Sequence, residues 1–387
     1  MTTNNINIPA DWQMKFLGDI GTFSKGAGIT KNDLVDIGKP CVRYAELYTK
    51  FEFVIPKCIS FIPEDIAKKS KQIQKGCILF AGSGETKEEI GKCAVYDNDE
   101  IAYAGGDNII YTIKDNYPVY LSYYLNTLGR RQLNKLGQGY SIVHIHAEDL
   151  KKVKIPRPPL LEQEKIAEIL SCWDEAIEKL SDLIELKKLL KKGLMQKLLT
   201  GKTRLLGFTQ PWKEVKLGDV CSICTGKKDV NEGNPCGIYP FFTCARNNTF
   251  SDNFSFDKEA ILIAGNGEVG NCQYYNGKFE AYQRTYVLSD FKVNGLLLFQ
   301  YLDYFFKQYV DNQKQQGAMP YIKLGTLTSF PIYISNDSQE QNKILNILLD
   351  ADSEIKFLKK KLELLQKQKK GLMQQLLTGK IRVKVDK

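Results

Sequence analysis

The chain has 387 residues, of which 43% are hydrophobic and 26% charged, a composition that excludes a disordered or fibrous protein and suits two or three globular domains. The formal net charge of +9 hints at an anionic partner without identifying it. No apolar run is long enough to span a bilayer, the N-terminus lacks a signal-peptide core, and the ten cysteines are scattered through the chain. We therefore expect a cytoplasmic protein with reduced thiols and no membrane partner.

The sequence is an internal duplication, because several segments recur in the same order. The repeated pairs are residues 12–19 and 212–219, 78–85 and 261–268, 162–163 and 340–341, and 193–202 and 371–380. Ten near-identical residues in a row, as in the last pair, do not arise from composition. The separation between copies falls from 200 to 178 residues along the chain, so the second copy has shorter loops.

Each copy begins with a mixed part of short strands, turns and one helix. β-type runs punctuated by glycines predict strands at 77–80 in the first copy and 260–263 in the second. A helix is expected at 118–128, where Pro118 suits the first helical turn, and its counterpart is expected at 296–309. The mixed parts therefore predict two similar α/β domains.

Each copy ends in a long helix whose apolar residues alternate in steps of four and three, which is the period of a coiled coil. The expected interface residues are Ile166, Leu170, Trp173, Ile177, Leu180, Ile184, Leu194 and Leu198 in the first helix, and Ile344, Leu348, Ile355, Leu358, Leu362, Leu365, Leu372 and Leu376 in the second. Lys187, Lys191, Ala351 and Lys369 fall on the same seams. Both helices should end at a Thr-Gly pair after ~50 Å.

The charge pattern predicts that the two helices pair in antiparallel orientation. Residues 162–182 carry seven acids and two bases, whereas residues 185–204 carry one acid and seven bases. The second helix repeats this, with five acids and one base at 337–354 and two acids and eleven bases at 356–387. Only an antiparallel pair sets each acidic half against a basic half, and Glu168 should then lie near Gln374. The alternative is that the helices lie on separate surfaces.

The expected fold is α+β, with two similar mixed α/β domains separated by two long antiparallel coiled-coil helices and related by an internal pseudo-twofold axis. The expected boundaries are 1–159 for the first mixed domain, 160–205 for the central helical region, 206–336 for the second mixed domain and 337–387 for the C-terminal helical region. Dimeric DNA readers hold half-sites ~34–36 Å apart or a multiple of it. Two related heads on a rigid spacer would read two different half-sites.

The junctions between the parts resemble one known family. Residues 139–142, 150–156, 158–160 and 162–166 look like the junction between the target recognition domain and the conserved helix in the specificity (S) subunit of Type I restriction-modification systems. Residues 76–79 and the glycine turn at 82–84 are similar to the family's Gly-Asp-Ile-Leu run, with Cys77 in place of the acid. The second copy keeps 330–332 and 339–341 but lacks the double proline.

This resemblance implies a non-catalytic DNA-reading scaffold. The S subunit of that family binds a split, asymmetric sequence in double-stranded DNA with one half-site per recognition domain. Its helices dock two adenine-methyltransferase (M) subunits, and restriction/translocase (R) subunits join that core. The resemblance further implies that this chain has no cofactor, and that S-adenosylmethionine, ATP and Mg belong to the partner subunits.

No catalytic or metal site is expected from the sequence. The glycines at 265, 267 and 270 match a dinucleotide fingerprint in form, but the first copy lacks the third glycine and no βαβ unit follows. Cys221 and Cys224 have neither a second Cys-x-x-Cys nor a nearby histidine. His144 and His146 could form a metal pair, contact DNA or make no contact, and the second copy has Tyr321 and Lys323 at their positions.

Three polar loop clusters recur at matched places, and loops with hydrogen-bonding and basic side chains are what DNA bases and phosphates need. The candidate DNA-binding residues are Lys25, Arg43, Tyr44, Ser83, Glu85, Thr86, Lys87, Tyr103, Asn108, Gln138, Tyr140, Ser141 and His144 in the first copy, and Lys227, Lys228, Arg246, Asn247, Asn266, Tyr282, Gln283, Arg284, Lys314, Gln315, Tyr321 and Lys323 in the second. The clusters also contain Asp107, Glu268, Thr285 and Gln316.

Two further hypotheses remain beside the specificity subunit: a self-contained nuclease or methyltransferase, which the missing motifs disfavour, and a coiled-coil adaptor without sequence-specific DNA binding. The helical regions hold 21 of the 54 bases and 15 of the 45 acids, so only +3 of the net charge lies elsewhere. We therefore expect the isolated chain to bind DNA weakly, with its partners supplying much of the phosphate contact.

Overall fold

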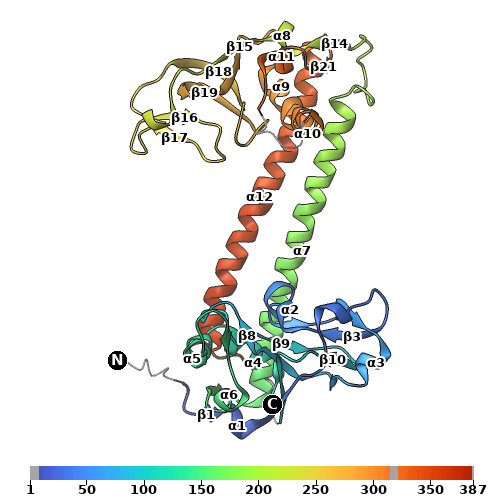
Figure 1. Ribbon diagram of the computed structural model, residues 1–387, viewed down its shortest axis with the longest axis vertical. Helices are drawn as coiled ribbons and strands as arrows, with labels where there is room; N and C mark the ends of the chain where they lie inside the picture. The colour runs from blue at the N-terminus through green and yellow to red at the C-terminus, as the bar shows by residue number, and fades with distance from the viewer. Residues whose placement is uncertain (1–7, 115, 314–320, 386–387) are drawn as a thin grey trace. The chain divides into compact units, whose positions relative to one another are not determined.

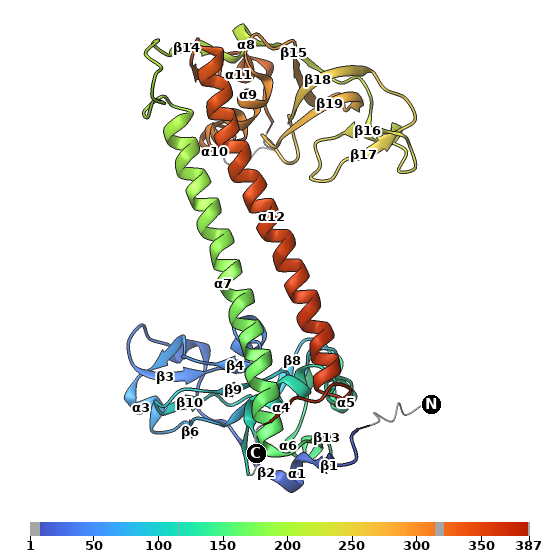
Figure 2. The ribbon, with the colours of Figure 1, turned by 180° about the vertical axis from the view of Figure 1, so that it is seen from behind.

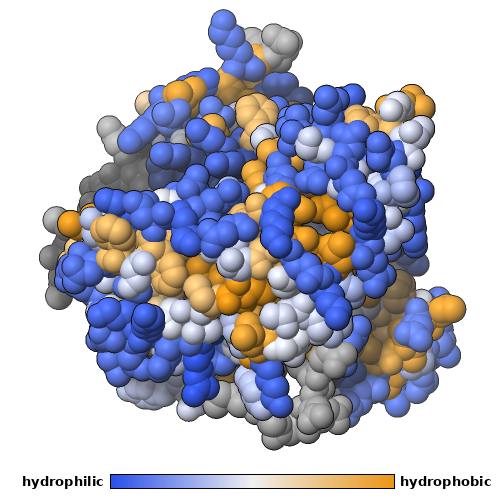
Figure 3. Space-filling model, turned by 90° about the horizontal axis from the view of Figure 1, so that it is seen from above, coloured by the Kyte–Doolittle hydropathy of each residue, from blue (hydrophilic) through white to orange (hydrophobic). Residues whose placement is uncertain are grey.

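The computed structural model describes residues 8–114, 116–313 and 321–385. The chain divides into two compact units: unit 1 is Met1–Lys179 with Leu362–Lys387, and unit 2 is Leu180–Lys361. Each unit thus combines one mixed domain with part of each long helix. Across the described ranges, no helix is both long and apolar enough to cross a membrane. The face shown in Figure 3 is mainly hydrophilic, with smaller hydrophobic patches among the polar side chains.

The mixed domain of unit 1 is built on a five-stranded and a four-stranded sheet. In sheet order, the larger contains β2 (Gly21–Lys25), β11 (Asn108–Ile113), β7 (Ile78–Ala81), β9 (Cys93–Tyr96) and β4 (Val54–Ile55), and the smaller contains β5 (Ser60–Ile62), β3 (Lys39–Val42), β10 (Ala102–Ala104) and β6 (Lys71–Ile73). Two short antiparallel pairs join β1 (Gln13–Phe16) to β13 (Lys154–Arg157) and β8 (Ser83–Gly84) to β12 (Val143–His144). The helices are α1 (Leu17–Ile20), η1 (Lys31–Asp33), α2 (Tyr44–Thr49), α3 (Glu64–Ala67), α4 (Pro118–Asn126), α5 (Arg130–Leu136) and α6 (Ala147–Leu150).

Unit 2 contains one six-stranded sheet and a two-stranded ribbon. The sheet order is β15 (Ser222–Thr225), β20 (Thr285–Ser289), β18 (Phe256–Ala264), β19 (Cys272–Ala281), β16 (Tyr239–Phe242) and β17 (Thr249–Ser251), and the ribbon joins β14 (Lys213–Lys216) to β21 (Pro331–Ile334). The helices are α8 (Leu217–Val220), η2 (Val230–Glu232), α9 (Gly295–Tyr301), the π-helix η3 (Leu302–Phe306), α10 (Lys307–Gln313) and α11 (Leu324–Thr328).

The elements expected in the mixed parts are present in both units. The expected helix at 118–128 is α4, with Pro118 in its first turn, and its buried tyrosines pack on Phe80 and Tyr111 of the sheet. The expected helix at 296–309 is interrupted by the π-helical turn η3. Phe306 in that turn is fully buried in the core of unit 2. The hydrophobic pattern therefore found the helix but not its change of pitch.

The long helices are α7 (Leu160–Leu198) and α12 (Ser338–Leu376), each of 39 residues. In unit 1, Ile166 and Leu170 near the start of α7 share a core with Met373 and Leu376 near the end of α12. In unit 2, residues 195–199 near the end of α7 share a core with residues 344–348 near the start of α12. The helices are therefore antiparallel within each unit, as the charge pattern predicts, and both views of the ribbon show them side by side (Figures 1 and 2).

The interface residues expected from the heptad pattern are buried or half-buried at every position. The regular helices end at Leu198 and Leu376, and the glycine three residues later adopts a left-handed conformation in each case, with φ of +66° at Gly201 and +70° at Gly379. A side chain at Gly379 would lie 2.5 Å from Pro9, so the glycine also lets the chain pass close to the N-terminal segment. Thr-Gly is thus the helix stop in both copies.

Candidate nucleic-acid interface

Four segments of unit 1 that carry or adjoin expected DNA-binding residues are joined by backbone hydrogen bonds. The Gly26 N–H donates to the Asn108 carbonyl at 2.9 Å, and the Gly82 N–H donates to the Asp107 carbonyl at 2.8 Å. The Ile145 N–H donates in turn to the Gly82 carbonyl at 3.0 Å. The structure therefore brings the segment after β2, the glycine turn, the turn before β11 and the segment before the junction into one site.

Glycine is required where these loops meet. A Cβ on Gly26 would lie 2.1 Å from the Gly105 carbonyl oxygen, and a Cβ on Gly82 would lie 2.8 Å from the Asp107 carbonyl oxygen. Both distances are shorter than real Cβ contacts, so any other residue would push the loops apart. Gly26 and Gly82 therefore set the distance between loops that present polar side chains.

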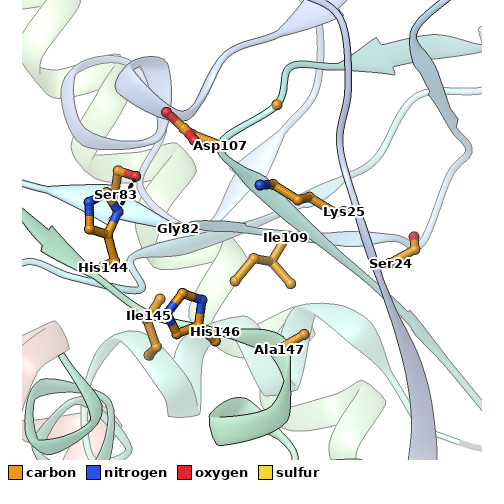
Figure 4. A pocket seen from close by; sticks show the side chains of 11 residues that line it. Ser24, Lys25, Gly82, Ser83, Asp107, Ile109, His144, Ile145, His146 and Ala147 are labelled. Atoms are coloured by element: carbon orange, nitrogen blue, oxygen red, sulfur yellow. Dashed lines mark hydrogen bonds between the residues drawn. The ribbon is translucent and has the colours of Figure 1, made fainter. Parts of the chain in front are cut away.

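A hollow of about 130 Å³ lies between these loops (Figure 4). Lys25 and Asp107 line it from one side and the two histidines from the other. The Ser83 hydroxyl and His144 Nδ1 are 2.9 Å apart and hydrogen-bonded, where β8 pairs with β12. The site thus offers a carboxylate, an ammonium group and imidazole rings within one small concave surface, which is a set of donors and acceptors suited to a polar, charged ligand.

Most unit 1 candidates lie at the surface, but they do not all belong to this site. The exposed candidates are Lys25, Glu85, Thr86, Lys87, Gln138, Tyr140, Ser141 and His144, whereas Arg43, Tyr44 and Tyr103 are half-buried and Ser83 is buried. Arg43 forms an ion pair with Glu46 at 3.0 Å where α2 begins. Tyr140 is fully exposed in the loop that Gln138 and His144 close through two backbone hydrogen bonds.

The structure corrects the prediction that the Asn108 side chain is available to contact DNA. Its side chain is 0% exposed, and its amide nitrogen donates to the Val42 and Gly105 carbonyls at 2.9 and 3.2 Å. The residue therefore holds the turn from the inside and does not reach a ligand in this conformation. Its sequence neighbour Asp107 is the exposed polar residue of the same turn.

Unit 2 repeats the arrangement of loops bond for bond. The Gly226 N–H donates to the Thr285 carbonyl at 3.2 Å, the Gly265 N–H to the Arg284 carbonyl at 3.0 Å, and the Ile322 N–H to the Gly265 carbonyl at 2.8 Å. A Cβ on Gly226 would lie 1.9 Å from the Ala281 carbonyl oxygen. The same backbone arrangement therefore carries the loops in both units. We call it the loop frame: residues 26, 82, 107, 108 and 145 in unit 1, and residues 226, 265, 284, 285 and 322 in unit 2.

The unit 2 candidates are again mostly exposed. Those at the surface are Lys227, Arg246, Asn247, Gln283, Arg284, Tyr321 and Lys323, and those half-buried are Lys228, Asn266 and Tyr282. Lys228 forms an ion pair with Glu232 at 2.7 Å, and Lys323 Nζ lies 5.9 Å from the ring centre of Tyr321. Thr285 is buried, with 1% of its surface exposed. Lys314, Gln315 and Gln316 lie outside the described residues.

Two sequence patterns considered for catalysis or metal binding, the glycine fingerprint and the cysteine pair, can be placed in the structure. Gly267 and Gly270 have φ of +62° and +79° in the turn between β18 and β19, so the glycine fingerprint is a turn between two antiparallel strands. Burial raises the pKa of the Cys221 thiol to about 12, which disfavours the thiolate that metal binding needs. Within the described ranges, no group of three metal-ligating side chains could hold an ion.

A buried glutamate at the start of each long helix was not assigned from the sequence. In unit 1, Glu162 is 2% exposed and accepts hydrogen bonds from the Trp12 indole at 3.0 Å and from Arg382 at 2.7 and 2.8 Å. Arg382 also binds Asp11 at 2.7 and 2.9 Å, and these carboxylates, Glu162 first, raise the pKa of its guanidinium. The C-terminal segment is thus tied to the N-terminal segment and to α7.

Unit 2 has the same cluster at matched positions. Glu340 is fully buried and accepts bonds from Arg204 at 2.8 and 3.0 Å, from the Trp212 indole at 3.0 Å and from the Ser335 hydroxyl at 2.6 Å. Burial opposes ionisation of Glu340, but the hydrogen bonds outweigh it and hold the pKa of this carboxyl below its usual 4.5. We call these clusters the glutamate clamps: Glu162, Trp12 and Arg382 in unit 1, and Glu340, Trp212 and Arg204 in unit 2.

The glutamine after each clamp glutamate joins the long helix to the mixed domain. Gln163 accepts from the Tyr117 N–H at 3.0 Å, just before α4, and donates to the Pro158 carbonyl at 2.9 Å. Gln341 accepts from the Asn294 N–H at 3.1 Å, just before α9, and donates to the Ser335 carbonyl at 2.8 Å. The repeats at 12 and 212 and at 162 and 340 were the sequence signal for these junctions.

Each helix seam also contains a matched ion pair. In unit 1, Lys369 is paired with Asp174, which accepts a bond from the Tyr123 hydroxyl at 2.5 Å. In unit 2, Lys191 lies 2.7 Å from Asp352, which accepts from the Gln300 amide at 3.2 Å. A partly buried polar pair in an apolar seam favours one register of the helices over others.

Comparison with known proteins agrees with this architecture. The Type I restriction modification DNA specificity domain model matches residues 9–188 and 209–367. The chain is 35% identical to the Type I restriction enzyme EcoDI specificity subunit of Escherichia coli, over 43% of this chain and 37% of that protein. It is 29% identical to the putative MjaX specificity subunit of Methanocaldococcus jannaschii, over 97% of this chain and 95% of that protein.

A solved structure shows the same fold. The crystal structure of the Type I restriction-modification system S subunit from M. genitalium has a TM-score of 0.64 and 21% sequence identity, and the match covers 97% of this chain and 98% of that one. The family model matches most of the chain, in two segments that correspond to the two copies of the duplication. The chain therefore belongs to the family of Type I restriction-modification DNA specificity proteins.

Proposed function

We propose that this chain is the DNA specificity subunit of a Type I restriction-modification complex and reads an asymmetric bipartite target, with one half-site per unit. The observation that carries the proposal is the matched pair of loop frames. Equivalent backbone hydrogen bonds hold four segments together in each unit, but the exposed side chains on these segments differ. Two equal frames with different side chains are suited to reading two different short sequences.

The chain itself supplies recognition and scaffolding, and catalysis belongs to its partners. We propose recognition domains at 1–159 and 206–336, and helical regions at 160–205 and 337–387 that bind two methyltransferase subunits, with restriction/translocase subunits joining the complex. S-adenosylmethionine, ATP and Mg would bind those partners. A complex that acts on cellular DNA places this subunit in the cytoplasm.

The charge distribution supports the idea that this subunit and its partners both contribute contacts with DNA phosphates. Most of the net charge of +9 belongs to the helical regions, and in the structure basic residues such as Lys191 and Lys369 are used in helix pairing. Phosphate contacts give affinity and its salt dependence. We therefore expect the isolated subunit to bind DNA weakly, and its complex with methyltransferase subunits to bind with a steeper dependence on salt.

The test is methylation sequencing of cells with and without this chain. Loss of one bipartite methyladenine motif on deletion, and its return on complementation, is the expected result. A methylome that does not change, together with equal binding of the assembled complex to all DNA sequences, would contradict sequence reading and favour a protein-binding adaptor. DNA modification by the purified chain alone would contradict the assignment of catalysis to partners.

A further inference from the structure

One position in the loop frame carries opposite charge in the two units. Asp107 and Arg284 occupy equivalent places, because the carbonyl of each accepts the N–H of the matched glycine, Gly82 or Gly265. The residue that follows each of them accepts the next matched bond, from Gly26 or Gly226. Two matched hydrogen bonds therefore hold the backbone at this position in the same way in both units, and the side chain at the position differs.

Both side chains are available to a ligand. Asp107 and Arg284 are exposed, and neither forms an ion pair or a side-chain hydrogen bond with any other described residue. The loop beside each of them also differs. Lys25 precedes Gly26 and lines the hollow with Asp107, whereas Thr225 precedes Gly226 and the exposed Lys227 follows it. Each unit thus has a lysine next to this glycine, and the charge that changes sign is that of Asp107 and Arg284.

The chemistry of these groups limits what each can bind on DNA. A carboxylate only accepts hydrogen bonds and is repelled by phosphate, so on DNA it suits an exocyclic amino group, which cytosine N4 and adenine N6 present in the major groove. A guanidinium only donates, and its fork matches O6 and N7 of guanine. Because the backbone is held in the same way in both units, the two side chains would meet matched places on their half-sites.

We propose that Asp107 and Arg284 are matched base readers, Asp107 accepting from the amino group of a cytosine or adenine in one half-site and Arg284 donating to a guanine in the other. This inference rests on the proposed function of the chain and adds which residue reads in each unit and which class of base it takes. Each residue sets one base position, and the two positions lie in different half-sites.

The experiment uses the full-length chain assembled with its methyltransferase subunits, and selection from random-sequence duplex DNA defines the target of the unsubstituted complex. Asp107→Asn and Arg284→Gln are then assayed on all single-base variants of that target. An amide both donates and accepts and pairs best with adenine. We expect each variant to change the base preference at one position of one half-site by about 5- to 150-fold, with the other half-site unaffected.

Matched controls separate reading from general charge. Asp36→Asn in unit 1 and Lys213→Gln in unit 2 remove an exposed charge outside the loop frame and should leave every base preference unchanged. If a variant fails to assemble, Asp107→Glu or Arg284→Lys replaces it, because these keep the charge but displace the hydrogen-bonding atoms.

The outcomes distinguish this inference from the proposed function. Unchanged preferences at every position, or an equal loss of binding across all sequences, would overturn the reader assignment while bipartite selection by the unsubstituted complex upheld the function. A change by both variants in the same half-site would also overturn it. Absence of bipartite selection by the unsubstituted complex would instead reject the proposed function.

Discussion

The glutamate clamps and the loop frames are both duplicated, but they differ in what the two copies share. The clamps repeat the side chains as well as the bonds: a tryptophan indole and an arginine meet a buried glutamate in each unit. The loop frames repeat the backbone bonds but not the side chains. The Asp107 carbonyl accepts a hydrogen bond from the Gly82 N–H, and in the other unit the Arg284 carbonyl accepts the equivalent bond from Gly265. Closely similar junctions therefore carry different surfaces.

This difference shows that the clamps constrain which residue types are present, whereas the loop frames constrain the backbone. A buried carboxylate needs specific donors, because an uncompensated charge inside a protein is costly, so the clamp leaves little freedom in residue type. A loop held through its backbone leaves its side chains free to vary. The molecule can thus carry two different reading surfaces without changing how each is attached to the long helices.

The largest effect is expected from removing a clamp arginine. Arg382→Ala leaves the buried Glu162 with the Trp12 indole as its one remaining side-chain donor among the described residues. The Arg382 side chain is itself 43% exposed, so water screens the pair, and we expect a loss of about 2–4 kcal/mol, below the upper end for a fully buried pair. Arg204→Ala should cost less, because Glu340 keeps bonds from Trp212 and Ser335. Chemical denaturation read by hydrogen exchange in each unit measures both costs.

The clamp comparison has a control in the same chain. Arg131→Ala removes an exposed arginine of unit 1 and should change the free energy of unfolding by less than ~0.5 kcal/mol. A loss for Arg382→Ala as small as that of the control would mean that Glu162 does not depend on this pair.

A smaller effect is expected from the ion pairs in the helix seams. Lys369→Met removes a lysine that is 6% exposed and lies 4.4 Å from the ring centre of Phe53, so the methionine can pack but Asp174 loses its cation. We expect a loss of about 1–3 kcal/mol for this variant and about 1 kcal/mol or less for Lys191→Met, because Asp352 is more exposed than Asp174. Equal losses, or a larger loss for Lys191→Met, would contradict this order.

The smallest effect concerns pH. The pKa of Glu340 is lower in the folded protein than its usual 4.5, so its stabilising contribution is fully present above 4.5 and is lost as pH falls through the folded value. The difference in unfolding free energy between the native chain and Glu340→Gln should therefore be largest near neutral pH and shrink below pH 4.5. A difference that grows in acid would reverse the sign and contradict the role of the carboxylate.

Features written into local patterns could be predicted from the sequence. The heptad seams, the Thr-Gly stops and the antiparallel pairing follow from spacing and charge, and the duplication aligned His144 with Tyr321. Asn108 could not be placed correctly, because an asparagine in a turn looks the same whether its amide faces solvent or the Val42 carbonyl. The clamps could not be assigned because Trp12, Glu162 and Arg382 are joined only by tertiary folding.

The strand order was equally out of reach from local patterns. β2 pairs with β11, and β11 with β7, across long stretches of sequence whose hydrophobic runs have no marker of their partners. Gly82 belongs to the repeated segment 78–85, but nothing in that repeat shows that it lies against Asp107. The contact to Asp107 that makes this residue a candidate reader appears only in the folded structure.

The central claim is that each recognition domain reads its own half-site, and replacing the second with a copy of the first tests it most directly. Residues 206–336 would be exchanged for residues 1–159, and the target of the complex assembled with methyltransferase subunits would be determined by selection from random-sequence DNA. We expect a target made of two copies of the first half-site. Retention of the original asymmetric target, or assembly without any sequence selection, would contradict the claim.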